Sequence, residues 1–155
     1  MMKGLQILVA ALVLVSAIGC SSERLQLPTP LRPSVEQELL LAAKRGDAVA
    51  VWAALATGTP PDYADDRGKT ALTFAAREGH LAMAETLIAY GAIVDWQDDE
   101  QTTPLILAAS HNHPEMVTLL LSNGARSTIQ DQWGRTALDY AERRGSDDPI
   151  AMMLR

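Results

Sequence analysis

Near its middle the chain reads Thr103-Pro104-Leu105-Ile106-Leu107-Ala108-Ala109. Threonine is a favoured residue at a helix N-cap and proline is favoured at the first helical position, so this stretch predicts the start of a helix. Similar stretches begin at Thr70 and at Thr136, which lie 33 residues before and 33 residues after Thr103. A fixed period of this length is typical of proteins built from stacked structural repeats.

Apolar residues recur at the same interval and predict the core. One helical unit cannot bury its apolar face alone, so stacked units bury these faces against their neighbours. Residues at equivalent positions of successive repeats form a column. The predicted core columns are Leu72, Leu105 and Leu138 together with Ala75, Ala108 and Ala141, and the outer layer is filled by Leu87, Ile88, Leu119, Leu120 and Leu121. The stack then gains its stability mainly from the interfaces between neighbouring units.

The charge and the cysteine content argue against two classes of protein. The 155-residue chain has a formal net charge of −6, and without residues 1–19, which hold Lys3 and no acidic residue, the net charge is −7. Nucleic acid attracts basic surfaces, so we expect no nucleic-acid partner. The chain has one cysteine, which excludes a scaffold of internal disulfides.

The N-terminal residues predict a secretory signal. Lys3 precedes an almost uninterrupted apolar run from Leu5 to Ile18, which is shorter than the roughly 20 residues that a spanning helix needs. The run ends in Gly19 and Cys20, and this resembles the bacterial lipobox, in which cleavage occurs before a cysteine that then carries the lipid. We therefore predict a lipoprotein signal peptide at 1–19 and lipidation at Cys20, with an ordinary signal peptide and a chance cysteine as the alternative.

Residues 20–33 are predicted to be the lipidated cysteine and a proline-rich tether. Pro28, Pro30 and Pro33 favour extended geometry, which at about 3.1 Å per residue gives a reach of roughly 40 Å. Ser21 stands where, in bacterial lipoproteins, an aspartate favours retention at the inner membrane. We therefore expect a protein lipid-anchored in the cell envelope, in the outer membrane facing the periplasm if the host has an outer membrane.

Residues 34–155 predict about four helical units, of which the first and the last are atypical. Residues 34–65 form an N-terminal capping unit that is opened by a capping box of Ser34 and Gln37. Residues 66–98 and 99–131 form two complete repeats, and residues 132–155 form a C-terminal capping unit.

Residues 65–98 and 98–131 are similar to the ankyrin repeat pattern D-x-x-G-x-T-P-L-H-x-A-A-x-x-G-H-x-x-x-V-x-x-L-L-x-x-G-A, and residues 131–146 follow its first half. The resemblance implies an all-α fold, an ankyrin-repeat solenoid of about four helix-turn-helix units with β-turn fingers. The motif histidine is replaced by Thr73, Ile106 and Asp139, so the hydrogen bonds that it provides between neighbouring loops in the family cannot form through that residue.

Gln101 is a second departure from the pattern. It stands where Gly68 and Gly134 supply a turn glycine in the neighbouring units. We therefore expect a positive φ at Gln101, a conformation that is uncommon for residues other than glycine and that costs some stability.

No arrangement of side chains in the sequence predicts catalysis. His111 and His113 are two residues apart, which is a poor spacing for two ligands on one helical face. Asp98, Asp99 and Glu100 form an acidic cluster at a predicted turn, which we interpret as a solvated finger tip because no calcium-binding loop surrounds it. We therefore expect a protein that is not an enzyme and that holds no metal and no cofactor.

The resemblance implies that partners bind the concave side, which is formed by finger tips and by the ends of the inner helices. The candidate partner-binding residues are Arg67, Lys69, Arg77, Glu78, Glu100, Trp133, Arg135, Arg143 and Arg144. Tryptophan and arginine are enriched among residues that dominate binding energy, which favours Trp133 as the main candidate. The alternative is that Trp133 only packs on Arg135. Trp96 is expected to pack at the base of the fingers, and Trp52, at an outer-helix position, to cover the tether or the open end of the stack and not to form a ligand site.

The sequence therefore predicts a membrane-anchored envelope lipoprotein whose ankyrin domain mediates docking or scaffolding through its concave face. The alternative is a periplasmic inhibitor or immunity protein that occludes a partner enzyme or toxin. We expect a monomer that binds a protein partner.

Overall fold

The computed structural model describes residues 33–145 and 147–155, and Pro33–Arg155 form one compact unit. The predicted signal peptide, Cys20 and the predicted tether up to residue 32 lie outside the described residues. No helix in the described part of the chain is long and apolar enough to cross a membrane.

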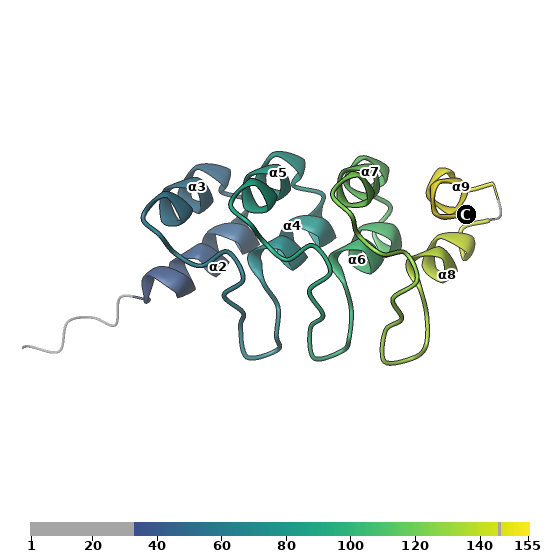
Figure 1. The fold of residues 1–155 in the computed structure, drawn as a ribbon, viewed down its shortest axis with the longest axis horizontal. Helices are drawn as coiled ribbons and strands as arrows, with labels where there is room; N and C mark the ends of the chain where they lie inside the picture. The colour runs from purple at the N-terminus through teal and green to yellow at the C-terminus, as the bar shows by residue number, and fades with distance from the viewer. Residues whose placement is uncertain (1–32, 146) are drawn as a thin grey trace, which may run out of the picture. The chain divides into compact units, whose positions relative to one another are not determined.

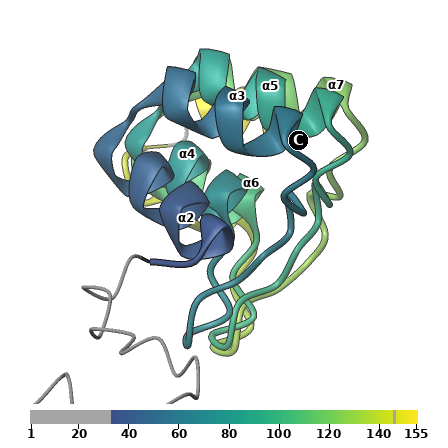
Figure 2. The same cartoon turned by 90° about the vertical axis from the view of Figure 1, so that its left-hand side faces the viewer.

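The described residues form eight helices in two rows (Figure 1). The inner row consists of α2 (Val35–Arg45), α4 (Ala71–Glu78), α6 (Pro104–Ser110) and α8 (Ala137–Glu142). The outer row consists of α3 (Ala48–Ala56), α5 (Leu81–Ala89), α7 (Pro114–Ser122) and α9 (Pro149–Leu154). Each inner helix packs against the outer helix that follows it and against the next inner helix, which confirms the predicted all-α solenoid. Figure 2 shows that the loops between units all extend to the same side of the two rows.

The inner helices begin where the capping residues predict. Thr70, Thr103 and Thr136 are N-caps whose hydroxyl groups accept a hydrogen bond from the backbone N–H three residues further on. Ser34 and Gln37 form the predicted capping box at the start of α2. Each N-cap satisfies a backbone donor that the first helical turn leaves without a partner, which fixes where the helix starts.

Each finger is folded around an aspartate. One carboxylate oxygen of Asp65, Asp98 and Asp131 accepts hydrogen bonds from the backbone N–H groups two and four residues further on. These two bonds hold the turn closed in every finger. Among the described residues the backbone forms one isolated β-bridge, between Ala64 and Thr70 at the base of the first finger.

The predicted core columns are buried between the helices. The members with at most 1% exposed surface are Leu72, Leu105, Ala75, Ala108 and Ala141. Leu138 is only partly buried, because no further inner helix covers α8 within the described residues. In the outer row, Leu87 and Leu120 are fully buried.

Two residues other than glycine have a positive φ within the described part. Gln101 has a φ of 58°, which confirms the prediction made from its neighbours in the column. Asn112 has a φ of 64°, which the sequence pattern did not predict. Asparagine adopts this left-handed conformation more readily than most residues, so its cost is moderate.

The column of Asn112 contains a glycine with a positive φ in each of the two preceding units, and a histidine ring lies close to each glycine. A Cβ at Gly46 would lie 2.7 Å from Nε2 of His80, and a Cβ at Gly79 would lie 2.6 Å from Nδ1 of His113. The next position in the histidine column, 146, is a serine. No ring therefore requires a glycine at position 112.

Within the described residues, the side chains at the motif histidine position form no hydrogen bond to another unit. Thr73 and Asp139 hydrogen-bond to the N-cap residues of their own helices. A different histidine joins two units, because Nε2 of His113 lies 3.0 Å from the carbonyl oxygen of Arg77.

Candidate protein-binding surface

The three finger tips form one continuous edge, the finger ridge (residues 66–69, 99–102 and 132–135). The backbone N–H of Asp99 donates to the carbonyl oxygen of Arg67 at 3.2 Å, and that of Gln132 donates to the carbonyl oxygen of Glu100 at 3.0 Å. Arg67 and Glu100 are exposed, and Trp133 is 56% exposed. Positions 67, 100 and 133 thus present three different side chains to solvent along one hydrogen-bonded edge.

Trp133 and Arg135 pack against each other on the last finger. The guanidinium carbon of Arg135 lies 4.6 Å from the centroid of the Trp133 ring, which is a cation–π contact. The same guanidinium lies 4.8 Å from the Tyr140 ring, and its Nε lies 3.3 Å from Oδ2 of Asp131. The packing of Trp133 on Arg135 is therefore present, and more than half of the tryptophan surface still faces solvent.

Asp131 is the centre of this cluster. Its Oδ2 accepts a hydrogen bond from the Tyr140 hydroxyl at 2.6 Å, and its Oδ1 accepts from the N–H groups of Trp133 and Arg135. Burial pushes the pKa of Asp131 upward, but the Tyr140 hydroxyl, the two backbone donors and the Arg135 cation together hold that pKa below its ordinary value. The Arg143 guanidinium lies 5.1 Å from the Tyr140 ring. The cluster is a fixed base that presents Trp133 and Arg143 to solvent.

Two of the predicted site residues are engaged in contacts within the domain. Arg144 donates to the carbonyl oxygen of Ala109 at 2.8 Å and pairs with Asp148 at 2.7 Å, so it connects the last unit to the one before. Nζ of Lys69 lies 3.9 Å from Oδ2 of Asp98 on the next finger. Their side chains are 28% and 20% exposed, respectively, so the domain already covers most of each.

Asp98 differs from the aspartates of the other fingers. Its Oδ2 is buried and accepts no hydrogen bond within the described residues. Burial raises the pKa of Asp98, and the backbone donors of Thr102 and Glu100 and the Lys69 cation offset this rise only in part.

A polar hollow of about 310 Å³ lies beside the first finger. It is lined by Lys44, Asp65, Asp66, Arg67, Lys69, Phe74 and Arg77. Arg77 pairs with the adjacent Glu78 at 3.3 Å, and both side chains are about half exposed. Exposed pairs of this kind contribute little to stability, so Arg77 and Glu78 remain available to a partner.

Lys44 and Phe74 were missed by the sequence reasoning. Nζ of Lys44 lies 3.3 Å from Oδ2 of Asp65 and 4.7 Å from the centroid of the Phe74 ring. The repeat interval could have found both residues, because Lys44 lies one interval before Arg77 and Phe74 lies two intervals before Tyr140.

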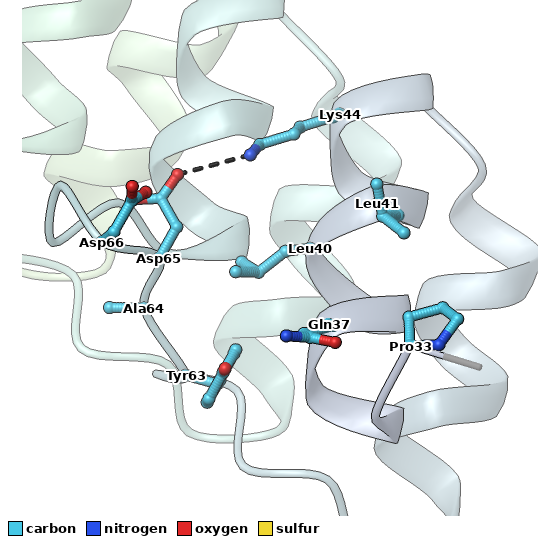
Figure 3. Close-up of a pocket in the computed structure, with 9 residues that line it drawn as sticks. All are labelled: Pro33, Gln37, Leu40, Leu41, Lys44, Tyr63, Ala64, Asp65 and Asp66. Atoms are coloured by element: carbon cyan, nitrogen blue, oxygen red, sulfur yellow. Dashed lines mark hydrogen bonds and ion pairs between the residues drawn. The ribbon is translucent and has the colours of Figure 1, made fainter. Parts of the chain in front are cut away.

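A second hollow, of about 430 Å³, lies at the first unit between α2 and the loop that leads to the first finger (Figure 3). Leu40 and Leu41 of α2 and Tyr63 of the loop form its apolar side, and the Lys44–Asp65 pair forms a polar edge. The sequence reasoning did not predict it. The hollow is open because no unit precedes α2 within the described residues, and the missing opening turn of the first unit is the signal that could have indicated it.

Trp96 and Trp52 are the two remaining tryptophans. Nε1 of Trp96 donates to the carbonyl oxygen of Gly68 in the first finger tip at 2.7 Å, and Trp96 is partly buried. Trp52 is 55% exposed on α3. Within residues 33–145 and 147–155, no group of three or more histidine, cysteine, aspartate and glutamate side chains could hold a metal ion.

Comparison with known families agrees with the repeat architecture. The family model described as ankyrin repeats (3 copies) matches residues 39–131 and 97–155. A search of curated proteins found no match. Ankyrin repeats generally mediate protein–protein interaction, and proteins built from them are typically non-enzymatic binding scaffolds. Because the matched residues cover most of the chain, it belongs to the ankyrin repeat family.

Proposed function

We propose that this chain is a membrane-anchored envelope lipoprotein whose ankyrin domain docks another protein on the finger ridge and the adjoining ends of the inner helices. The exposure of Trp133 carries the proposal for the binding surface. The core of the last unit does not need this ring, because the leucine and alanine columns already fill the interior. A half-exposed tryptophan beside arginines has the composition of an interface centre.

The charge distribution supports a surface of this kind. Residues 1–32 hold three of the 13 basic residues and one of the 19 acidic residues, which leaves ten basic and 18 acidic residues, a net charge of −8, in residues 33–155. Within this acidic domain, Arg67, Arg77 and Arg143 are exposed. They offer a partner hydrogen-bond donors, and Arg143 lies beside the Tyr140 ring.

The binding surface is tested by capture from membranes with the intact chain as bait. Trp133→Ala should lower the affinity for the partner by about 1–2 kcal/mol, which is roughly a 5- to 30-fold weaker complex, and should barely change the melting temperature. The control is Glu85→Ala on the outer helix α5, where the side chain is exposed and belongs to no finger. A protein that is captured by wild type and by the control, but is lost with Trp133→Ala, is the partner.

Two results would contradict the proposed surface. If Trp133→Ala unfolds the domain, the ring serves packing on Arg135 and not binding. If capture survives Trp133→Ala and is lost on Glu85→Ala, the partner binds the outer helices. A captured enzyme or toxin that forms a one-to-one complex and loses its activity would identify an inhibitor or immunity protein in place of a scaffold.

The membrane anchor is tested separately through Cys20. Cys20→Ser should yield a chain without lipid that washes off membranes, because the lipid is the expected source of stable attachment. The mass of the mature N-terminus and the fraction that floats with membranes are the two measurements. Unchanged mass and unchanged retention would show that Cys20 is not the anchor.

A further inference from the structure

Helix α3 is apolar on all of its sides, although it lies in the outer row. Its sequence, AVAVWAALA, contains no charged and no hydrogen-bonding side chain other than the indole of Trp52. Val51 and Leu55 are buried against the rest of the domain. On the other side, Val49 is 76% exposed and Trp52 is 55% exposed. A helix with no polar face is expected in a buried environment, and the domain itself buries only one side of α3.

The exposed positions of α3 form one continuous stripe, the α3 stripe (Val49, Trp52, Ala53 and Ala56). All four residues are exposed. Their spacing of three, four and seven residues from Val49 places them on the same face of the helix.

The repeat architecture does not require apolar residues in this stripe. One interval later, the positions of Val49 and Trp52 are occupied by Ala82 and Glu85 on α5, and two intervals later by glutamate and threonine on α7. All of these residues are exposed. The fold therefore accepts polar residues at these equivalent positions. Exposing the apolar side chains of α3 to water is unfavourable, and the neighbouring units avoid this cost.

We propose that the α3 stripe lies on the lipid surface of the membrane to which the N-terminus is attached, an inference that rests on the proposed membrane anchor. Tryptophan favours the boundary between headgroups and acyl chains, because its ring is apolar and its N–H is polar. A short helix with an apolar face can lie in this boundary without crossing the membrane.

The length of the preceding chain supports lipid as the occupant. Twelve residues lie between Cys20 and Pro33, which limits the distance between the membrane and the domain to roughly 40 Å. Pro33 precedes α2 and lines a hollow of about 300 Å³ together with Asp47 and Ala50 at the start of α3. Attachment makes contact with the bilayer an intramolecular event, for which a small apolar stripe is sufficient.

The charges around α3 do not oppose this contact. Residues 44–62 contain two basic residues, Lys44 and Arg45, and two acidic residues, Asp47 and Asp62. The net charge of this segment is therefore zero, whereas residues 33–155 together carry −8. The repulsion between the acidic domain and anionic headgroups is accordingly reduced at α3.

The test uses the full chain, isolated from membranes with its N-terminal attachment intact. The chain is reconstituted into vesicles of phosphatidylethanolamine and phosphatidylglycerol, with and without brominated acyl chains that quench tryptophan on contact. The emission of Trp52 is the difference between wild type and Trp52→Phe. We expect this difference emission to shift to shorter wavelength on vesicles and to be lost with brominated lipid, while the emission of the Trp52→Phe chain is the same in both kinds of vesicle.

A matched pair of charge substitutions provides the control. Val49→Glu should restore the Trp52 emission in brominated vesicles, because it places a charge in the α3 stripe. Ala82→Glu introduces the same charge in the same column on α5 and should leave the quenching unchanged. Both positions are exposed, so both variants are expected to fold.

The outcomes separate the stripe from the anchor. If the chain floats with the vesicles and Trp52 emission is insensitive to bromine, the anchor stands and the lipid contact of α3 is wrong. If the chain does not float, the anchor is wrong, and an unquenched Trp52 then refutes the lipid contact as well. Protection of α3 from hydrogen exchange that depends on a copurifying protein, and not on lipid, would assign the stripe to a protein partner and overturn the proposal.

Discussion

Two equivalent finger aspartates differ in their contacts, and a single substitution should give Asp98 one hydrogen bond that Asp131 has and Asp98 lacks. Oδ2 of Asp131 accepts a hydrogen bond from the Tyr140 hydroxyl at 2.6 Å, whereas the buried Oδ2 of Asp98 accepts none within the described residues. The residue one interval before Tyr140 is Leu107, which is partly buried on α6. Leu107→Tyr should therefore place a hydroxyl group beside Asp98 in the way that Tyr140 places one beside Asp131.

We expect Leu107→Tyr to stabilise the domain by about 1 kcal/mol at neutral pH. A hydrogen bond to a charged group contributes about 1.5–3 kcal/mol. Part of this gain is offset, because Lys69 already lies 3.9 Å from Asp98 and because Leu107 gives up apolar contacts. A gain of about 1 kcal/mol corresponds to a rise of roughly 3 °C in the melting temperature of a domain of this size.

The gain in stability from Leu107→Tyr should depend on pH and should be larger at higher pH. Burial raises the pKa of Asp98 in the folded wild type. The protonated carboxyl group is therefore favoured by folding, and the stability that it contributes is present at low pH. This stability is lost as the pH rises through the raised pKa. The new hydroxyl donates to the charged carboxylate and lowers this pKa. The advantage of Leu107→Tyr should therefore be small at low pH and should grow as the pH rises past the ordinary carboxyl range.

Urea denaturation at a series of pH values measures this advantage, and Tyr140→Phe serves as the mirror control. The pKa of Asp131 is held below its ordinary value despite its burial, so Tyr140→Phe should cost stability at neutral pH and less at low pH. An advantage of Leu107→Tyr that is the same at every pH would mean that the hydroxyl does not reach Asp98. Lower stability at all pH values would mean that the ring does not fit beside the second finger.

Two further substitutions test the core and the turn. Leu105→Ala should cost about 2–5 kcal/mol, because Leu105 is 1% exposed in the central interface between units, and an unchanged midpoint of chemical denaturation would contradict that assignment. Gln101→Gly should raise the stability by about 1 kcal/mol, because residue 101 has a φ of 58°, and a lower midpoint would show that the glutamine side chain stabilises the turn more than its backbone strain costs.

The sequence predicts the architecture well where the same chemistry returns at every interval. Local chemistry predicts these features, because the residue type at each position is enough to indicate its role. They are the threonine N-caps, the capping box at Ser34 and the alanine columns. Gln101 departs from the repeat pattern, but its φ could still be predicted. The glycines at the equivalent positions of the neighbouring units indicate that the backbone needs a positive φ there.

The features that the sequence does not predict depend on contacts between units. Gly46 and Gly79 have a positive φ that already favours glycine, and a side chain at either position would also clash with the ring of His80 or His113, which belongs to the following unit. The polar hollow beside the first finger likewise combines Lys44 of α2 with finger residues of the next unit. Such contacts follow from the stacking geometry, and a pattern read along one unit does not contain them.

The candidate site was predicted as a set of residue types, and the structure separates its members by their contacts. Arg144 and Lys69 have carboxylate partners within the domain, whereas Arg143 contacts the Tyr140 ring and Arg67 is exposed on the first finger. Burial and pairing are properties of the assembled stack, so residue type and interval alone could not rank these cations. The prediction that they bind a partner remains to be tested by the capture experiment with Trp133→Ala.

The repeat interval also divides the surface into positions that the fold controls and positions that it leaves free. The core columns keep leucine and alanine in successive units, whereas positions 67, 100 and 133 hold arginine, glutamate and tryptophan, and positions 52, 85 and 118 hold tryptophan, glutamate and threonine. Equivalent backbone positions accept these different residues, so the stack does not require a tryptophan at either place. Trp133 and Trp52 are nevertheless more than half exposed, one on the last finger and the other on the outer row of the first unit. We propose a contact outside the domain for each ring, a protein partner for Trp133 and lipid for Trp52, and because the rings lie on separate elements, each contact can be removed by itself.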